Sequence, residues 1–233
     1  MAVYFGSGNA ISLSSALVSD EPLTISTWVN CDDITNYHRV AAVSEVGGTD
    51  QRMQLTVDGT RSSPVDPVGA EHKGSSSNRT ARSTVAYQQD VWEHIGGVWT
   101  DNSNRASWLN GIEYTDSGDI GTITLGESWI GESMLGAIAD AAFWNVALSD
   151  DEMISLSNGY PPLLIRPQSL IAYLPLMNAA SALVDLKGTT WTENGTLTDF
   201  ATHPPIMMPV QQKIFIPAAS AASNNFMTLL GAG

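Results

Sequence analysis

Residues 136–152 read Gly-Ala-Ile-Ala-Asp-Ala-Ala-Phe-Trp-Asn-Val-Ala-Leu-Ser-Asp-Asp-Glu, and this stretch decides the fold class. Its first part, residues 136–147, is rich in small and aromatic residues and predicts a long strand. Its second part predicts a helix start, because Ser149 is followed three residues later by Glu152, the spacing of a capping box. The paired prolines at 161 and 162 predict where this helix has ended. We therefore expect one long strand that leads into one short helix.

The rest of the chain predicts more strands and no further helix. Residues 23–30 alternate, which places Leu23, Ile25, Thr27 and Val29 on one face and Trp28 on the other. Asn110-Gly111 lies between two alternating runs and is the strongest hairpin signal. Other strands are predicted at residues 52–57, 92–100 and 169–177. Many short strands, regular turns and one short helix predict an all-β antiparallel sandwich.

One internal segment departs from the strand pattern. Residues 58–83 are polar and rich in turn formers, so we predict a long surface loop or an insertion there. Asp58-Gly59 at its start fits a type I′ turn after the strand at 52–57.

The last segment, residues 203–233, differs from the rest in composition. It holds a single formal charge, Lys213, together with four prolines and many apolar residues. Proline disfavours a long helix or a central strand, so we predict an extended arm that follows a sandwich domain at residues 1–202. Apolar side chains of the arm are predicted to contact a neighbouring subunit; they are Ile206, Met207, Met208, Ile214, Phe215, Ile216, Phe226, Met227, Leu229 and Leu230.

Charge and cysteine content exclude several classes of function. The chain has 10 basic and 24 acidic residues, a formal net charge of −14, which argues against nucleic acid or an anionic membrane as partner. Cys31 stands alone, so neither an internal disulfide nor a cysteine-cluster zinc site is expected. The opening residues lack a basic region followed by an apolar run, so we expect synthesis and folding in a cytoplasm.

The order of these segments resembles the concanavalin A-like jelly rolls of the laminin-G-like group, in particular those of tailed-phage structural proteins. The segments that carry the resemblance are residues 4–12, 23–29, 92–94, 107–111, 136–152, 172–176 and 185–197. The resemblance implies a jelly-roll sandwich with one short helix. It says less about function, because this fold hosts hydrolases, lectins and inert spacers.

The pattern of carboxylates argues against an enzyme. Hydrolases of the resembled fold often carry a Glu-x-Asp-x-x-Glu run on one strand, and the sequence has none. Glu113 and Asp116 are expected on opposite strand faces, and Glu127 and Glu132 flank Trp129 without sharing a face. No Gly-x-Ser-x-Gly elbow occurs either, so we predict a protein without catalytic residues.

The resemblance raises calcium as the one candidate cofactor, because related lectin-like domains bind it between loops. Asp140 matches the acidic position of the closing strand, and Asn9 lies in the turn after the first phenylalanine. These two residues with carbonyl oxygens would form a weak site. The alternative is that Asp140 is a structural residue held by hydrogen bonds and that no cofactor is bound.

Two functions from different classes remain. The first is a structural protein of a virion, made in a host cytoplasm: a capsid decoration or cement protein, homo-oligomeric on the particle, that binds the major capsid protein or other virion subunits. The alternative is a carbohydrate-binding module that attaches to host-surface glycans through exposed aromatic residues beside polar groups. Most of the seven tryptophans are expected to fill the core instead.

Overall fold

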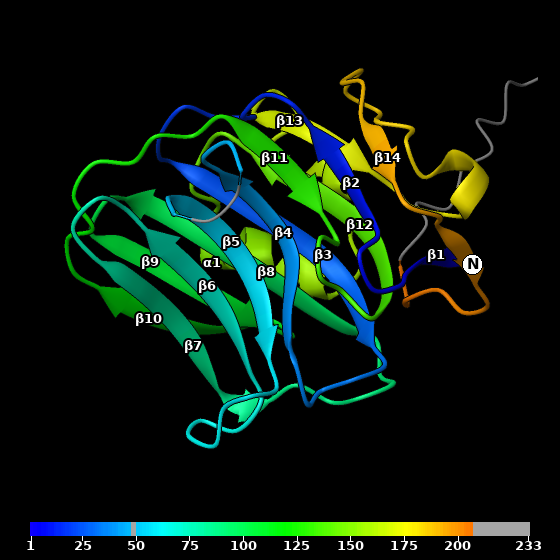
Figure 1. Cartoon of the computed structure of the whole chain (residues 1–233), viewed down its shortest axis with the longest axis horizontal. Helices are drawn as coiled ribbons and strands as arrows, with labels where there is room; N and C mark the ends of the chain where they lie inside the picture. Colours follow the sequence, from blue (N-terminus) through cyan, green and yellow to red (C-terminus); the bar gives the residue numbers. More distant parts are fainter. Residues whose placement is uncertain (48–49, 207–233) are drawn as a thin grey trace, which may run out of the picture.

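The computed structural model describes residues 1–47 and 50–206, and within them the chain forms two antiparallel sheets packed face to face (Figure 1). The described part has one α-helix, α1 (Asp150–Ser157), and two short 3₁₀ turns, η1 (Pro162–Leu164) and η2 (Ala179–Ser181). The predicted all-β sandwich with one short helix is therefore confirmed. None of the helices in these residues has the length and apolar character needed to cross a membrane.

Within the described residues the first sheet has eight strands. Their order is β10 (Ile112–Ser117), β9 (Asn104–Leu109), β8 (Glu93–Asp101), β3 (Leu23–Cys31), β12 (Gly136–Trp144), β1 (Ala2–Phe5) and β15 (Thr198–Phe200), and β13 (Leu170–Leu174) also pairs with β12.

The second sheet has seven strands in the same part of the chain. Their order is β14 (Thr192–Asn194), β2 (Ala10–Leu13), β11 (Glu127–Ile130), β4 (Tyr37–Ser44), β5 (Arg52–Asp58), β6 (Pro67–Lys73) and β7 (Asn78–Ala86).

The alternation predicted for residues 23–30 sorts their side chains as expected. Leu23, Ile25 and Val29 are fully buried in the core between the sheets. Trp28 points the other way and packs with Ala137 and other small residues on the outer side of the eight-stranded sheet. The central strand β3 has no exposed residue, because both of its faces are covered by packed side chains.

Helix α1 packs on the outer side of the eight-stranded sheet through Met153 and Leu156. Its predicted capping box is present, because Glu152 Oε2 accepts a hydrogen bond from the backbone N–H of Ser149 at 2.8 Å. A Cβ added at Gly96 on β8 would collide with Met153, so this glycine lets the helix approach the sheet closely.

The predicted hairpin at Asn110-Gly111 is confirmed. Asn110 has φ +50° and Gly111 has φ +80°, the left-handed pair that a type I′ turn requires between β9 and β10.

The prediction of a loop or insertion at residues 58–83 is wrong. Residues 67–73 form β6 and residues 78–86 form β7, so most of this segment is sheet. In β6, Val68, Ala70 and His72 face the core, while the alternate positions are proline, glycine and two charged residues. Because several of these side chains are small or polar, the sequence of β6 does not show the alternation of apolar and polar residues that is typical of a strand. Asp58-Gly59 is not a two-residue turn either, because the connection from β5 to β6 spans residues 59–66.

The predicted boundary after residue 202 falls just beyond the last strand, which ends at Phe200. Ile206 is half-buried and is the last described residue. The other apolar arm residues named above, from Met207 to Leu230, lie outside the described residues.

Candidate functional site

A row of residues crosses six strands on the outer face of the seven-stranded sheet. Directly paired residues of neighbouring strands share a face. Their register gives the row Ser12, Trp129, Ala42, Gln54, Glu71 and Thr80, one residue from each of β2, β11, β4, β5, β6 and β7. The neighbours of Gln54 along β5, Met53 and Leu55, lie in the core, so the row faces outward. We call it the outer row.

The middle of the outer row is a network of hydrogen bonds centred on Tyr37. Gln54 Nε2 donates to the Tyr37 hydroxyl at 2.8 Å, and that hydroxyl donates to Glu71 Oε2 at 2.9 Å. Arg52 Nη2 lies 2.5 Å from Glu71 Oε1. Burial, together with the charge of Glu71, raises the pKa of the Tyr37 hydroxyl well above its ordinary value, which keeps the hydroxyl protonated. These polar groups are therefore held in fixed positions on the sheet.

At one end of the outer row lies a cavity of about 260 Å³, which we call the Trp129 cavity. Its lining includes Trp129, Glu127, Glu132, Ser12 and Asn194. It thus combines an aromatic ring, two carboxylates, an amide and a hydroxyl.

Each polar group of the Trp129 cavity has a partner that fixes it. Asn194 Nδ2 donates to Ser12 Oγ at 2.7 Å, and Arg39 Nη1 pairs with Glu132 Oε2 at 3.0 Å. The hydroxyl of Ser44, on the neighbouring strand β4, links the remaining two: Trp129 Nε1 donates to Ser44 Oγ at 3.1 Å, and Ser44 Oγ donates to Glu127 Oε1 at 3.2 Å.

Glu127 and Glu132 line this one cavity, contrary to the expectation that they share no face. Glu127 and Trp129 are two residues apart on β11 and so point to the same side. The strand then ends at Gly131, whose φ of +78° turns the chain and returns Glu132 to that side.

The sequence argument named Trp129 and both glutamates but missed the residues of the outer row on β4, β5 and β6. The signal was present for β5, where Arg52, Gln54 and Thr56 alternate with apolar residues. No alternating pattern points to Glu71. Its strand, β6, lies within residues 58–83, which were predicted to form a loop.

The structure does not bring the two predicted calcium ligands together. Asn9 engages Thr196 on both sides of its amide: Nδ2 donates to the carbonyl at 2.6 Å, and Oδ1 accepts the N–H at 3.3 Å. Asp140 lies on β12 and is hydrogen-bonded to Tyr173 of β13 instead. No group of three or more histidine, cysteine, aspartate or glutamate residues within the described chain could hold a metal ion.

Asp140 is buried on β12, and its carboxylate is hydrogen-bonded to another side chain of the protein. The Tyr173 hydroxyl donates to Asp140 Oδ1 at 2.5 Å. Burial raises the pKa of Asp140 to about 6, against the lowering effect of that hydrogen bond. This geometry fits the structural alternative for Asp140.

A buried serine–histidine pair lies beneath helix α1. His94 Nε2 and Ser26 Oγ are 2.8 Å apart, and burial lowers the pKa of His94 to about 3. His94 is fully buried, and its Nδ1 has no hydrogen-bond partner in the described structure. Asp140 is bonded to Tyr173, so this serine–histidine pair lacks the acidic third member of a triad. Burial first, and then nearby acids, raise the pKa of the Cys31 thiol to about 12, which makes this thiol a weak nucleophile.

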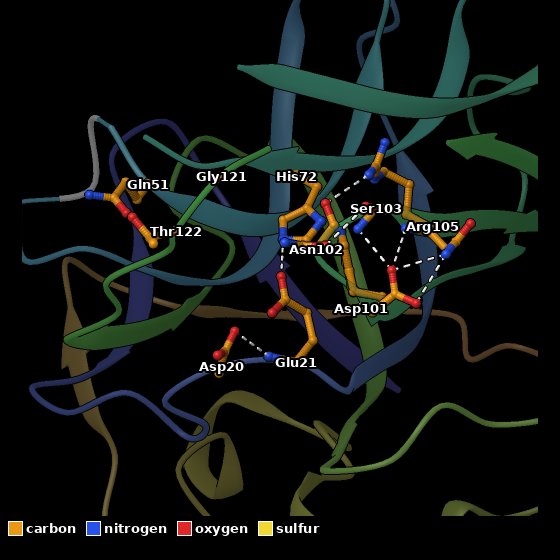
Figure 2. A network of polar contacts seen from close by, with 12 residues as sticks. Asp20, Glu21, Gln51, His72, Asp101, Asn102, Ser103, Arg105, Gly121 and Thr122 are labelled. Atoms are coloured by element: carbon orange, nitrogen blue, oxygen red, sulfur yellow. Dashed lines mark hydrogen bonds and ion pairs between the residues drawn. The ribbon is translucent and has the colours of Figure 1, made fainter. Parts of the chain in front are cut away.

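A third polar cluster lies at the loops of one end of the sandwich (Figure 2). Asp20 and Glu21 come from the loop before β3, residues 101–103 from the turn after β8, and Gly121 and Thr122 from the segment before β11. They surround a cavity of about 440 Å³. Glu21 is engaged with His72 of β6, so this cluster joins the sheets and serves the architecture.

Comparisons with known proteins agree with this fold. No curated protein matches the sequence. Among solved structures, a candidate carbohydrate-binding protein from Bacteroides ovatus has a TM-score of 0.63 at 18% identity, over 86% of this chain and 60% of its own. Domain 4 of an extracellular arabinanase from Geobacillus stearothermophilus, solved with arabinotriose, has a TM-score of 0.51 at 17% identity, over 64% of this chain and 72% of its own.

Tailspike protein 2 of an Escherichia coli O157:H7 bacteriophage has a TM-score of 0.54 at 13% identity, over 75% of this chain and 26% of its own. This chain thus spans about a quarter of that phage protein. At such identities the likenesses show the fold. The family profile described as concanavalin A-like lectin/glucanases superfamily matches residues 5–153, more than half of the sequence. The chain therefore belongs to the concanavalin A-like lectin/glucanase superfamily.

Proposed function

We propose that this protein is a carbohydrate-binding module that holds a glycan on the outer face of its seven-stranded sheet. The Trp129 cavity carries the proposal, because an aromatic side chain, two carboxylates, an amide and a hydroxyl line one hollow there. Sugar hydroxyls both donate and accept hydrogen bonds, so a set of fixed carboxylate, amide and hydroxyl groups suits them.

The outer row would extend this site along the sheet. Gln54 and Glu71 follow Trp129 and Ala42 in the row, and both are hydrogen-bonded to the Tyr37 hydroxyl of β4. Side chains held in place before a ligand arrives lose little conformational entropy on binding.

The charges of this face favour an uncharged glycan. The carboxylate of Glu132 is paired with Arg39 and that of Glu71 with Arg52, while Glu127 accepts a hydrogen bond from the neutral Ser44 hydroxyl. Paired charges still accept and donate hydrogen bonds but exert little net attraction on an ion. The proposed ligand is therefore a neutral oligosaccharide or polysaccharide.

We propose binding without cleavage. Glycoside hydrolysis needs one carboxylic acid to give a proton and a second carboxylate opposite it. In the Trp129 cavity both glutamates already accept from fixed donors, Ser44 for Glu127 and Arg39 for Glu132. Both are then suited to accept hydrogen bonds from sugar hydroxyls.

A virion location is compatible with this proposal. The composition of residues 203–233 favours contact with another subunit, and one solved structure of this fold is a phage tailspike. That comparison names a tailspike and no capsid protein, so the decoration or cement role on a capsid stays a prediction. A virion protein with a glycan-binding sandwich would combine both interpretations.

The test is glycan binding by the full chain and by variants of the Trp129 cavity. Neutral polysaccharides would be screened on an array and the best ligand measured by isothermal titration. Asn194→Ala and Glu132→Gln should each weaken binding about 5- to 30-fold, the loss expected for one hydrogen-bonding group. The matched control is Asp151→Asn, an exposed carboxylate on α1 at the opposite sheet. Equal affinity of all four proteins would overturn the site.

A further inference from the structure

Three large apolar side chains are exposed on the segment that follows α1. Tyr160 is 47% exposed, and Leu163 and Leu164 of η1 are 41% and 59% exposed. This segment lies on the outer side of the eight-stranded sheet, because Ile165 packs there and its carbonyl accepts a hydrogen bond from Trp144 Nε1 at 2.8 Å. It therefore offers apolar surface on the side of the sandwich opposite the outer row.

The apolar surface continues from Tyr160 to the point where the arm begins. Tyr160 and Trp28 line one small cavity. Trp92 and Phe200 are half-buried and pack against the cluster that contains Trp28, with their ring centroids 5.9 Å apart. Trp92 Nε1 then donates to the Thr202 hydroxyl at 2.9 Å. We call this continuous group the Tyr160 surface; it consists of Leu163, Leu164, Tyr160, Trp92 and Phe200.

The arm, residues 203–233, has the chemistry to cover the Tyr160 surface. A contiguous exposed apolar surface marks an interaction site, and the arm is the most apolar segment of the chain. The arm holds Lys213 as its single charge, so the sandwich of residues 1–202 carries nine basic and 24 acidic residues. Two such sandwiches repel each other, whereas a segment with one positive charge approaches either of them without repulsion.

The spacing of apolar residues along the arm favours the Tyr160 surface of a second copy over that of the same chain. The arm begins at one end of its own Tyr160 surface, because Thr202 is bonded to Trp92. Phe215 and Phe226 follow Thr202 by 13 and 24 residues, which span about 40 and 80 Å in an extended chain. The four prolines of the arm favour such an extended conformation. Both rings would then lie beyond the surface beside which the arm starts.

We propose that two copies of this chain exchange arms, so that residues 207–230 of each copy cover the Tyr160 surface of the other. The contact is reciprocal, so it closes around a two-fold axis and stops at a dimer. Phe215 and Phe226 are the largest apolar side chains of the arm and serve as its anchors. The dimer goes beyond glycan binding and leaves the Trp129 cavity free, because that cavity lies on the other sheet.

The test uses two full-chain variants with complementary defects. Leu163→Ser with Leu164→Ser changes the surface and keeps the arm, while Phe215→Ser with Phe226→Ser changes the arm and keeps the surface. Analytical ultracentrifugation should show a dimer of the unmodified chain and association at least about tenfold weaker for each variant alone. An equal mixture of the two variants should associate more tightly than either alone, since one intact arm then meets one intact surface.

The matched control is Val65→Ser with Val85→Ser, two residues that are each 53% exposed and belong to the half of the sandwich built by the seven-stranded sheet. This variant should dimerise like the unmodified chain, and circular dichroism would verify that all variants fold. A monomeric unmodified chain overturns the proposal, including the case in which the arm covers the surface of its own copy. The proposal is also overturned if the Leu163 and Leu164 variant dimerises normally, or if mixing the two variants restores no association.

Discussion

Glu21 Oε1 lies 2.5 Å from Nε2 of His72, and this contact joins the two sheets across the end of the sandwich (Figure 2). Glu21 comes two residues before β3 of the eight-stranded sheet, while His72 belongs to β6 of the seven-stranded sheet. The His72 side chain is fully buried and the Glu21 side chain is 6% exposed. A buried carboxylate such as that of Glu21 stays charged only when hydrogen bonds and nearby positive groups compensate for the lost hydration.

The first prediction is a loss of stability in acid that depends on Glu21. Burial alone would raise its pKa, but hydrogen bonds from His72 and from its neighbours in the chain outweigh burial and lower the pKa to about 2. The unfolded chain binds this proton near the ordinary pKa of 4.5. Stability from Glu21 is therefore complete above about pH 4.5 and is lost as the pH falls toward 2.

Urea unfolding between pH 7 and pH 2 would measure this effect. Glu21→Gln should cost about 1–3 kcal/mol at pH 7, because it removes the charged partner of a buried imidazole. The variant should also show a smaller decline than the unmodified chain between pH 4.5 and 2. Parallel pH profiles for the two proteins would contradict the prediction.

The second prediction concerns Asp140, where the sign is opposite. Its pKa is about 6 in the folded protein against 3.8 as the ordinary value, so the folded state holds the proton more tightly. Stability from this group is therefore highest below about pH 4 and falls as the pH rises through 6, by at most about 3 kcal/mol.

Asp140→Asn removes the charge and keeps an oxygen that accepts the Tyr173 hydroxyl. Asparagine also tolerates the φ of +51° at this position. We expect the variant to be as stable as the unmodified chain, or more stable, at pH 7 and to lack the decline between pH 4 and 6. Tyr173→Phe is the control, since it removes the donor and leaves the acid. A variant clearly less stable at pH 7 would show that the carboxylate itself is needed.

The third prediction is that chelation changes stability little. Asn9 and Asp140, the two predicted ligands, are occupied by Thr196 and Tyr173. Thermal unfolding with EDTA and with added calcium should give melting temperatures within about 2 °C of each other. A drop of more than about 10 °C on chelation would instead indicate a saturated metal site, because such binding contributes several kcal/mol.

The fourth prediction is that the protein does not hydrolyse glycans. Incubation with β-glucans and other polysaccharides should release reducing sugar at the background rate, even where the same polysaccharide binds. Glu127→Gln and Glu132→Gln provide the matched pair, one for each carboxylate of the Trp129 cavity. Clear turnover that one of these substitutions abolishes would make the cavity an active site.

The fold was predictable wherever local chemistry alone determined the structure. Alternation placed Trp28 opposite Leu23 and Ile25, and Asn110-Gly111 fixed a hairpin through its left-handed backbone. Strand β6 was not predictable in this way, because its outward residues include Gly69 and its inward residues include His72. Only pairing with β5 and β7 makes this sequence a strand, and such pairing is a tertiary effect.

The candidate site was predictable in part for the same reason. Trp129 and the two glutamates stand close in sequence, so a local argument found them but not their common cavity, which depends on the turn at Gly131. The Tyr37, Gln54 and Glu71 network brings together three strands that lie up to 34 residues apart in sequence. A network formed only by sheet register leaves no motif in the chain.

The last prediction concerns residues 203–233. Among residues 1–47 and 50–206 the last strand of either sheet ends at Phe200, and Thr202 accepts a hydrogen bond from Trp92 Nε1 at 2.9 Å. Truncation after Thr202 should therefore leave a folded sandwich with a melting temperature within about 5 °C of the full chain. It should bind the same polysaccharide, because the Trp129 cavity lies wholly within residues 8–194.

The truncated chain should nevertheless lose self-association and attachment to any virion particle, because burial of one large apolar side chain is worth about 1.5–3 kcal/mol and the arm carries ten predicted contact residues. Analytical ultracentrifugation and cosedimentation with particles would measure both. Phe215→Ser with Phe226→Ser in the full chain is the second variant, since it keeps the arm's length and removes two large contacts. Unfolding after truncation would mean that the segment completes the core of its own domain. Unchanged association would assign the contact to the sandwich and remove the arm from the mechanism of assembly.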